Sequence, residues 1–505
     1  MIPDRRRPPV PPRRPGAARR VEIPEETPSD VAAVDGVGET DAVAPVYDPI
    51  APAAEVRDHA GVAIDPERAD AVHDDAGRDE IGVEPTPLDL LVAALPDGAA
   101  FRAALAKPVR RALRRHPLRG SLNGWGEVTA IPWAKDGFFH APDADPGDRL
   151  DYHTGAGYPQ DAASQLPVAL LAPMPGETII DVCAAPGSKT TQIGIALGDS
   201  GLLLALDAAP ARRKVLTENL ARQGIANALV LPLTIAALAA KHPRAADAVL
   251  VDAPCSGHRD VRARQARRMG ERQLGLLAQA ALLVRPGGRM VYSTCTPWPD
   301  EDETVIAGFL AQHPGWMIDT PSMAGCDADL SGGGGLRLWP QRQGCEPFFA
   351  CRLRAPGSVD DRAGKAAVVG FSGHLPDHSR AIDHLFPGSG LHRWERGGVL
   401  FAATAAAATC ALPAESRGLR IGRLRQTRAG DMVDLEPWAA QALIERGAPA
   451  VAVSHATACE LWAGGTDRGL SAGDLVKTVA GGPLGVAGKD GRLDLPSRLR
   501  RSGLR

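Results

Sequence analysis

The sequence has little of several features that define common protein classes. Only 4% of its 505 residues are aromatic, and no apolar run approaches the roughly 18 residues that a membrane-spanning helix needs. The eight cysteines include no CxxC pair, so neither a metal site nor a disulfide framework is expected. The basic start lacks the apolar stretch of a secretory signal. We therefore expect a soluble, cytoplasmic protein that does not act at a membrane.

Charge is distributed in blocks. Residues 1–20 hold seven arginines and one aspartate, and residues 21–84 hold 18 acids and three arginines. Because the net charge of the whole chain is only −3, the rest of the chain is basic. The first 86 residues are rich in Pro, Ala, Asp and Glu and cannot bury enough apolar surface to fold. We predict that they form a disordered, solvating tail.

A first folded region is expected over residues 87–148. LDLLVAAL (88–95) and FRAALAKPVRRALRR (101–115) have helical spacing broken by prolines. Residues 101–120 contain no acid and seven basic residues, which are Arg102, Lys107, Arg110, Arg111, Arg114, Arg115 and Arg119. They form either a solvated helix face or a contact with RNA phosphates.

From about residue 165 to 355, short β-rich runs alternate with amphipathic helical stretches. This alternation predicts an α/β fold, a doubly wound, Rossmann-like parallel sheet with helices on both faces. LRLWPQRQGCEPFFACRLR (336–354) has the pattern of a closing hairpin. After a polar break, residues 365–505 form a separate C-terminal region.

The stretch ETIIDVCAAPGSKTTQ (177–192) predicts a cofactor site. A hydrophobic strand runs to Asp181, a turn of small residues follows, and a helix begins near Ser188. Such a turn lets a nucleotide-like ligand approach the backbone, and Asp207, at the end of the next strand, suits ribose hydroxyls. The motif is neither GxGxxG nor a P-loop, so an adenosine-type cofactor is favoured.

Two further strands end in a thiol. AVLVDAPCSG (248–257) places Asp252 and Cys255 after one strand, and GGRMVYSTCT (287–296) places Cys295 after another. Ligands bind outside the carboxyl ends of strands in such sheets, so both sulfurs are expected in one crevice.

DVCAAPGSKTTQ, DAPCSG and YSTCT together resemble the RNA 5-methylcytosine methyltransferases of the RsmB/RsmF/NSUN group. GYPQDAASQLP (157–167), PDEDE (299–303) and RLWPQRQGCEPFF (337–349) add to the likeness. KPVRRALRR, AIPWAKDGFF and GPLGVAGKDGRL resemble the RsmF-like branch, which modifies 16S rRNA. The resemblance implies a class I methyltransferase domain over 149–356, an RNA-binding region over 87–148 and a PUA-like α+β RNA-binding region over 365–505.

The resemblance also implies roles. Cys295 would be the nucleophile that adds to cytosine, Cys255 would assist product release, and Lys189 and Asp252 would hold the ring. S-adenosylmethionine would be bound by Cys183 (through its backbone), Ala184, Ala185, Pro186, Gly187, Ser188, Lys189, Asp207, Arg212 and Asp252.

Several of these residues also have a purely structural explanation. Lys189 is otherwise an exposed lysine at a helix N-terminus, and Asp207 a cap for the following helix. Arg212 either approaches the cofactor or lies in solvent. Tyr292 is expected to pack rather than to react.

The sequence departs from the family pattern in three places. In the N-terminal region, PLRGSLNGWGEV (117–128) is abbreviated. Thr234 stands where an acid usually follows the third strand. The segment between the two cysteines is short and carries HRDVRARQARRMGER, with six arginines against two acids. One hypothesis is that Arg262, Arg264 and Arg267 grip RNA phosphates.

We therefore predict an S-adenosylmethionine-dependent RNA cytosine-5 methyltransferase that acts as a monomer, most readily on small-subunit rRNA. Transfer RNA is the rival substrate. The alternative from a different functional class is a catalytically silent RNA-binding or ribosome-assembly factor.

Overall fold

The computed structural model describes residues 86–119, 122, 125–258, 263–358, 390–427, 430–446, 450–463, 465–471, 475–478, 483–487, 490 and 492–493. The segment predicted to be disordered, residues 1–86, lies outside the described residues except for Thr86.

Two short helices open the described chain, α1 (Pro87–Ala94) and α2 (Gly98–Leu105). Thr86 begins α1 with a capping box: its hydroxyl accepts a hydrogen bond from the Asp89 amide at 3.2 Å, and the Asp89 carboxylate accepts one from the Thr86 amide at 2.9 Å. Phe101 of α2 packs edge-to-face against Trp339, with 5.4 Å between the ring centroids. The helix pair is thereby anchored on the larger sheet described below.

The helical pattern predicted for residues 101–115 is wrong in its second half. α2 ends at Leu105, and β1 (Ala112–Arg115) is a strand in a sheet of order β2-β3-β1-β4. Pro108 lacks the amide hydrogen that a helix would use, and β1 pairs with strands on both sides, so tertiary pairing outweighs the local spacing. β1 pairs with β3 (Gly137–Phe139) and β4 (Gly157–Pro159), and β2 (Thr129–Ala130) pairs with β3. The short helices η1 (Pro146–Asp148) and α3 (Leu150–His153) lie between β3 and β4 in the chain. This sheet therefore continues past the domain boundary expected at 148.

The larger sheet has a parallel centre, with strand order β9-β8-β5-β6-β7. The central strands are β5 (Thr178–Asp181), β6 (Leu202–Leu206), β7 (Ala228–Leu231), β8 (Ala246–Asp252) and β9 (Val284–Thr294). Antiparallel strands extend the sheet beyond β9, namely β10 (Met317–Ile318), β11 (Asp327–Ala328), β12 (Leu336–Leu338) and β13 (Phe348–Arg354). The predicted α/β fold and the closing hairpin at 336–354 are confirmed, although the sheet is mixed rather than wholly parallel.

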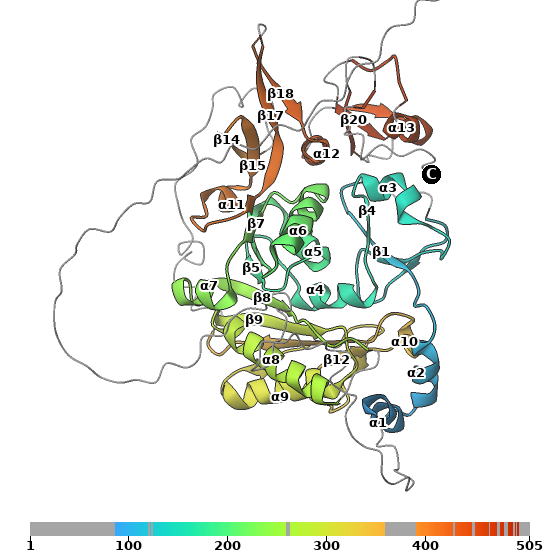
Figure 1. Ribbon diagram of the computed structural model, residues 1–505, viewed down its shortest axis with the longest axis vertical. Helices are drawn as coiled ribbons and strands as arrows, with labels where there is room; N and C mark the ends of the chain where they lie inside the picture. The colour runs from blue at the N-terminus through green and yellow to red at the C-terminus, as the bar shows by residue number, and fades with distance from the viewer. Residues whose placement is uncertain are drawn as a thin grey trace, which may run out of the picture. The chain divides into compact units, whose positions relative to one another are not determined.

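Helices cover both faces of this sheet (Figure 1). One layer holds α4 (Leu166–Leu171), α5 (Ser188–Leu197) and α6 (Pro210–Arg222), and the other holds α7 (Ile235–Lys241), α8 (Ala263–Ala281) and α9 (Glu303–Gln312). Short helices in the connections are η2 (Ala163–Gln165), η3 (Gly198–Ser200), η4 (Pro299–Glu301) and α10 (Pro340–Gln343).

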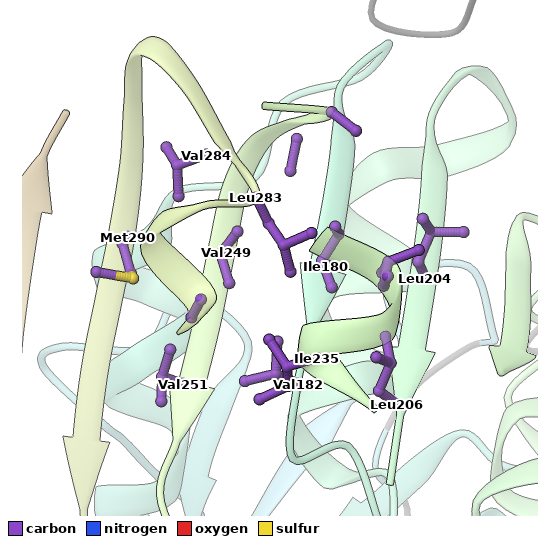
Figure 2. Close-up of a cluster of buried hydrophobic side chains, with 14 of the residues drawn as sticks. Ile180, Val182, Leu204, Leu206, Ile235, Val249, Val251, Leu283, Val284 and Met290 are labelled. Atoms are coloured by element: carbon purple, nitrogen blue, oxygen red, sulfur yellow. The ribbon is translucent and has the colours of Figure 1, made fainter. Parts of the chain in front are cut away.

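Alternate residues of each strand face opposite layers. Ile179 packs with the α4–α6 layer, and the next residue, Ile180, packs with the α7–α9 layer. Figure 2 shows this second core, where Val249 and Met290 from neighbouring strands lie near Leu283. Because both faces are buried, the central strands are almost continuously hydrophobic.

The C-terminal region contains two further sheets, of order β14-β15-β17-β18 and β19-β20-β21. Its elements are β14 (His392–Arg396), β15 (Val399–Ala403), α11 (Ala405–Thr409), β16 (Ser416–Arg417), β17 (Leu419–Thr427), β18 (Gly430–Leu435), α12 (Pro437–Glu445), β19 (Val451–Val453), α13 (His455–Trp462), β20 (Leu475–Thr478) and β21 (Pro483–Val486). β16 pairs antiparallel with β7, so this region also completes one edge of the larger sheet.

Candidate active site

The carboxyl ends of the parallel strands lie at one edge of the sheet. In the register of the sheet, Asp181 in β5 is the partner of Ala205 in β6, and Asp252 in β8 is the partner of Ser293 in β9. The residues that follow these strands are therefore close together, although they are far apart in sequence.

The first of these connections is the loop between β5 and α5. α5 begins at Ser188, and Gly187 before it has φ of +113°, a conformation that favours glycine. A Cβ at Gly187 would also lie only 3.0 Å from Cδ1 of Leu216. Thr190 fixes the loop from inside, because its hydroxyl donates to Asp181 at 2.8 Å or to the Ala184 carbonyl at 2.9 Å.

Asp207, just beyond β6, faces this loop. It is only 5% exposed, and its carboxylate accepts hydrogen bonds from the amides of Ala185 at 3.2 Å and Ala209 at 3.0 Å. Helix α6 has Ala209 as its N-cap residue, without a side-chain capping bond, so Asp207 is not the helix cap that was the alternative. Arg212 contacts the same loop: it lies 3.1 Å from the Asp207 carboxylate and donates to the Ala185 carbonyl.

Burial raises the pKa of two other residues of this loop region. It raises the pKa of Asp181 to about 7, against the opposing effect of the hydrogen bond from Thr190. It also raises the pKa of the Cys183 thiol well above its usual range. The Cys183 sulfur is therefore inert, and the residue can serve the site only through its backbone.

The second part of the site is a pair of cysteines. Cys255 follows β8 and Cys295 follows β9, and their sulfurs lie 2.9 Å apart. The two thiols are therefore adjacent, as their positions after neighbouring strands led us to expect. Cys295 is exposed, whereas Cys255 is half-buried.

The two thiols differ in acidity. Their shared hydrogen bond, followed by burial, raises the pKa of Cys255. The same bond lowers the pKa of Cys295, and Lys189 adds to this effect against the opposing effects of burial and of Asp252. Cys295 is therefore the more acidic thiol of the pair.

Lys189 and Asp252 form an ion pair beside the cysteines. The Lys189 ammonium donates to one oxygen of Asp252 at 2.6 Å, and Ser293 donates to the other oxygen at 2.8 Å. Burial disfavours the charged lysine, but the Asp252 carboxylate outweighs it, so the pKa of Lys189 lies above its usual range. Lys189 is thus a buried, charged side chain, not the exposed lysine of the alternative.

The sequence analysis missed two contributors to this arrangement. Ser293 lies in the YST motif and orients Asp252, and a short polar residue at a strand end was the available signal. Arg114, in β1, donates to the Ser188 carbonyl at 2.7 Å and to the Thr191 hydroxyl at 2.8 Å, so it holds the start of α5.

The basic run at 101–120 therefore does not form one free cationic face. Arg114 and Arg119 are buried, at 4% and 1% exposure. Arg102 pairs with Asp89, and Arg115 lies 3.1 Å from Asp136. These four arginines have partners within the protein, so the run does not form the continuous solvated helix face that was one alternative, and the contact with RNA phosphates stays a prediction.

Two other residues have structural roles. Thr234 caps α7, because its side chain accepts a hydrogen bond from the Ala237 amide at 3.1 Å. Tyr292 is fully buried and packs near Phe349, as expected for a packing residue. Of the arginines predicted to contact RNA phosphates, Arg262 and the side chain of Arg264 lie outside the described residues.

Within the described ranges, no group of three or more His, Cys, Asp or Glu side chains is arranged to hold a metal ion. In the same part of the chain, no helix combines the length and the apolar character needed to cross a membrane.

Residues 168–354 match the family model described as 16S rRNA methyltransferase RsmB/F. The chain is 34% identical over 333 residues to the ribosomal RNA small subunit methyltransferase F of Klebsiella pneumoniae (strain 342), an alignment that covers 60% of this chain and 69% of that protein. It is 31% identical over 452 residues to the protein of the same name from Citrobacter koseri, covering 80% of this chain and 91% of the relative. A crystal structure of a methyltransferase homolog from Pyrococcus horikoshii aligns with a TM-score of 0.48 and 27% identity, over 53% of this chain and 94% of the other.

Proposed function

Because the chain belongs to the RsmB/F family of 16S rRNA methyltransferases, we propose that it methylates carbon 5 of cytosine in small-subunit ribosomal RNA, with S-adenosylmethionine as methyl donor. The observation that carries the proposal is the 2.9 Å distance between the sulfurs of Cys255 and Cys295. Methyl transfer to an oxygen or an amine does not need two thiols in one pocket. Transfer to carbon 5 needs a nucleophile and a way to release it.

Cys295 supplies the nucleophile. Carbon 5 of cytosine is too weakly nucleophilic to attack a methyl sulfonium, but addition of a thiolate to carbon 6 turns the ring into an enamine. The exposure of Cys295 and its lowered pKa suit this step. The target base must leave its stack to reach the sulfur, so the substrate is a single-stranded or loop cytosine.

Lys189 and Asp252 hold the ring while charge develops on it. Their ion pair lies beside Cys295, and the orientation of Asp252 is fixed by Ser293. A preorganised pair of this kind stabilises the transition state without reorganising. Cys255, at hydrogen-bonding distance from the Cys295 sulfur, would assist product release, in which carbon 5 loses its proton and the bond between Cys295 and carbon 6 breaks.

The loop from Cys183 to Ser188, together with Lys189, Asp207, Arg212 and Asp252, would hold S-adenosylmethionine, which supplies the methyl group. The chain fits this ligand. Small residues leave the loop backbone open to a close approach, and Asp207 is held against the loop by its bond to the Ala185 amide. The remaining lone pairs of the Asp207 carboxylate suit the two hydroxyls of a ribose.

The flanking regions extend the same proposal. We assign RNA binding to the region over 87–148 and to a PUA-like region over 365–505, where Arg396 and Arg423 are exposed. One chain contributes every residue of the proposed site, which supports action as a monomer. Since small-subunit rRNA is a cytoplasmic substrate in bacteria, we place the activity there. Transfer RNA is the alternative substrate within the same chemistry.

The test is methyl transfer from labelled S-adenosylmethionine to small-subunit rRNA, total transfer RNA and unrelated RNA. We expect transfer to the ribosomal RNA, a loss of at least about 10³-fold in Cys295→Ala, and accumulation of a covalent RNA–protein adduct in Cys255→Ala. Transfer that survives in Cys295→Ala would show that the nucleophile is another group. Cofactor binding without transfer to any RNA would favour a catalytically silent RNA-binding factor.

A further inference from the structure

The two residues that flank Cys255 are held by a pair of buried side chains. Glu301, in η4, accepts hydrogen bonds from the Ser256 amide at 3.1 Å and from the Ser256 hydroxyl. Gln273, in α8, donates to the Pro254 carbonyl at 2.9 Å and to the Glu301 carboxylate at 2.9 Å. Both side chains belong to fully buried residues. We call Glu301 and Gln273 the clamp.

The clamp also contacts the strand that carries the other cysteine. The Tyr292 hydroxyl, in β9, donates to the Glu301 carbonyl at 2.6 Å. β9 ends immediately before Cys295. Glu301 therefore joins the loop of Cys255 to the strand of Cys295, and it helps to set the distance between the two sulfurs.

A carboxylate at this position is costly for the fold. Burying a charged group is unfavourable unless its oxygens are fully hydrogen-bonded. Glu301 meets this requirement with three hydrogen bonds, all from the Cys255 loop or from Gln273. An apolar side chain would fill the space without this cost but would leave the Ser256 amide and hydroxyl without their acceptor.

We propose that Glu301 and Gln273 are positioning residues that hold the Cys255 thiol against Cys295 for product release. The inference rests on the proposed function, in which Cys255 acts after methyl transfer. It goes beyond it by assigning the placement of Cys255 to two residues that lie outside the reacting groups.

The first experiment compares covalent adducts. In Glu301→Gln, the new side-chain amide faces the side-chain amide of Gln273. In Gln273→Ala, the Pro254 carbonyl loses its side-chain donor. In both variants we expect release of methylated RNA to slow about tenfold and adduct to accumulate, because a buried charge-assisted hydrogen bond is lost. Ser256→Ala keeps the backbone amide donor and should slow release less.

Two matched variants control for general destabilisation. Gln279→Ala changes a glutamine on the same helix, and Glu303→Gln weakens an ion pair with Arg337 in the same acidic run. Both should release product at the wild-type rate, even if their unfolding temperature falls. The proposal is overturned if Cys255→Ala accumulates adduct but neither clamp variant does, or if Glu303→Gln accumulates as much as Glu301→Gln.

A second measurement is independent of activity. Iodoacetamide alkylation of the two cysteines, followed by mass spectrometry without RNA, reports how the proton is shared between them. In the clamp variants we expect the ratio of the Cys295 rate to the Cys255 rate to fall about tenfold, since Cys295 loses its hydrogen bond with Cys255. An unchanged ratio of the two alkylation rates in both variants would overturn the proposal that the clamp positions Cys255. If the wild-type protein methylates no RNA, the proposed function fails, and this ratio alone decides the inference.

Discussion

At the scale of single residues, one lysine connects two parts of the proposed site. Lys189 lies in the first turn of α5, immediately after the cofactor loop, and its ammonium reaches Asp252 at the end of β8. It also lies 5.6 Å from the centre of the Phe348 ring. Its buried positive charge is one reason why the pKa of Cys295 is lowered.

Lys189→Met should raise the pKa of Cys295, because the thiolate loses a nearby cation. The thiolate then forms only at higher pH, so the pH profile for alkylation of Cys295 should shift upward by roughly one unit. Iodoacetamide rates between pH 6 and 10 measure this shift. Lys241→Met, at an exposed position on α7, is the control and should leave the profile in place. A profile that does not move in Lys189→Met would remove Lys189 from the activation of Cys295.

At the scale of elements, α8 connects the catalytic loop to a cationic surface. Its inner face packs closely on η4, since a Cβ on Gly270 would lie only 2.2 Å from the Asp300 carbonyl oxygen. Its outer face exposes Arg267, Arg268 and Arg272. Through Gln273, the same helix contacts the Cys255 loop. The proposed contact with RNA phosphates on this outer face would therefore belong to the same helix that holds the Cys255 loop.

Replacing Arg267, Arg268 and Arg272 together with alanine should weaken RNA binding and flatten its salt dependence. Each phosphate contact on a single strand contributes about 0.7 to the slope of log K against log salt, so the slope should fall by roughly 2. Fluorescence anisotropy at salt concentrations between about 50 and 300 mM measures this slope. A triple variant with the wild-type slope would contradict the phosphate contact, and Lys241→Ala tests for a general effect of charge.

At the scale of the whole molecule, Arg119 joins three regions of the described chain. Its guanidinium donates to the Thr154 carbonyl at 2.7 Å, to the Arg222 carbonyl in α6 and to the Glu445 carboxylate in α12. The side chains of Arg119 and Glu445 are 0% and 5% exposed. The first sheet, the larger sheet and the C-terminal region therefore share one buried ion pair.

Glu445→Gln should destabilise the protein by about 3 kcal/mol, because it leaves a buried guanidinium without its counter-charge. Chemical denaturation, followed by fluorescence, measures the free energy of unfolding. Asp199→Asn removes the partner of Arg446 at a half-exposed position and should cost at most about 1 kcal/mol. Equal losses in the two variants would mean that the buried pair does not join the regions as described.

The sequence by itself determined which strand ends come together at the proposed site. Strand ends marked by Asp181, Cys255 and Cys295 predicted one crevice, because parallel strands present their carboxyl ends at the same edge. These signals are local: a hydrophobic run, a turn of small residues and a reactive side chain in consecutive positions.

The tertiary structure alone decided what the arginines and acids do. Arg114 and Arg119 belong to a run that is basic in sequence, yet both are buried against partners distant in the chain. Glu301 belongs to an acidic run, yet it holds the loop of Cys255. A charged side chain has the same local pattern whether it faces solvent or a buried partner, so only the packing of distant elements distinguishes the two.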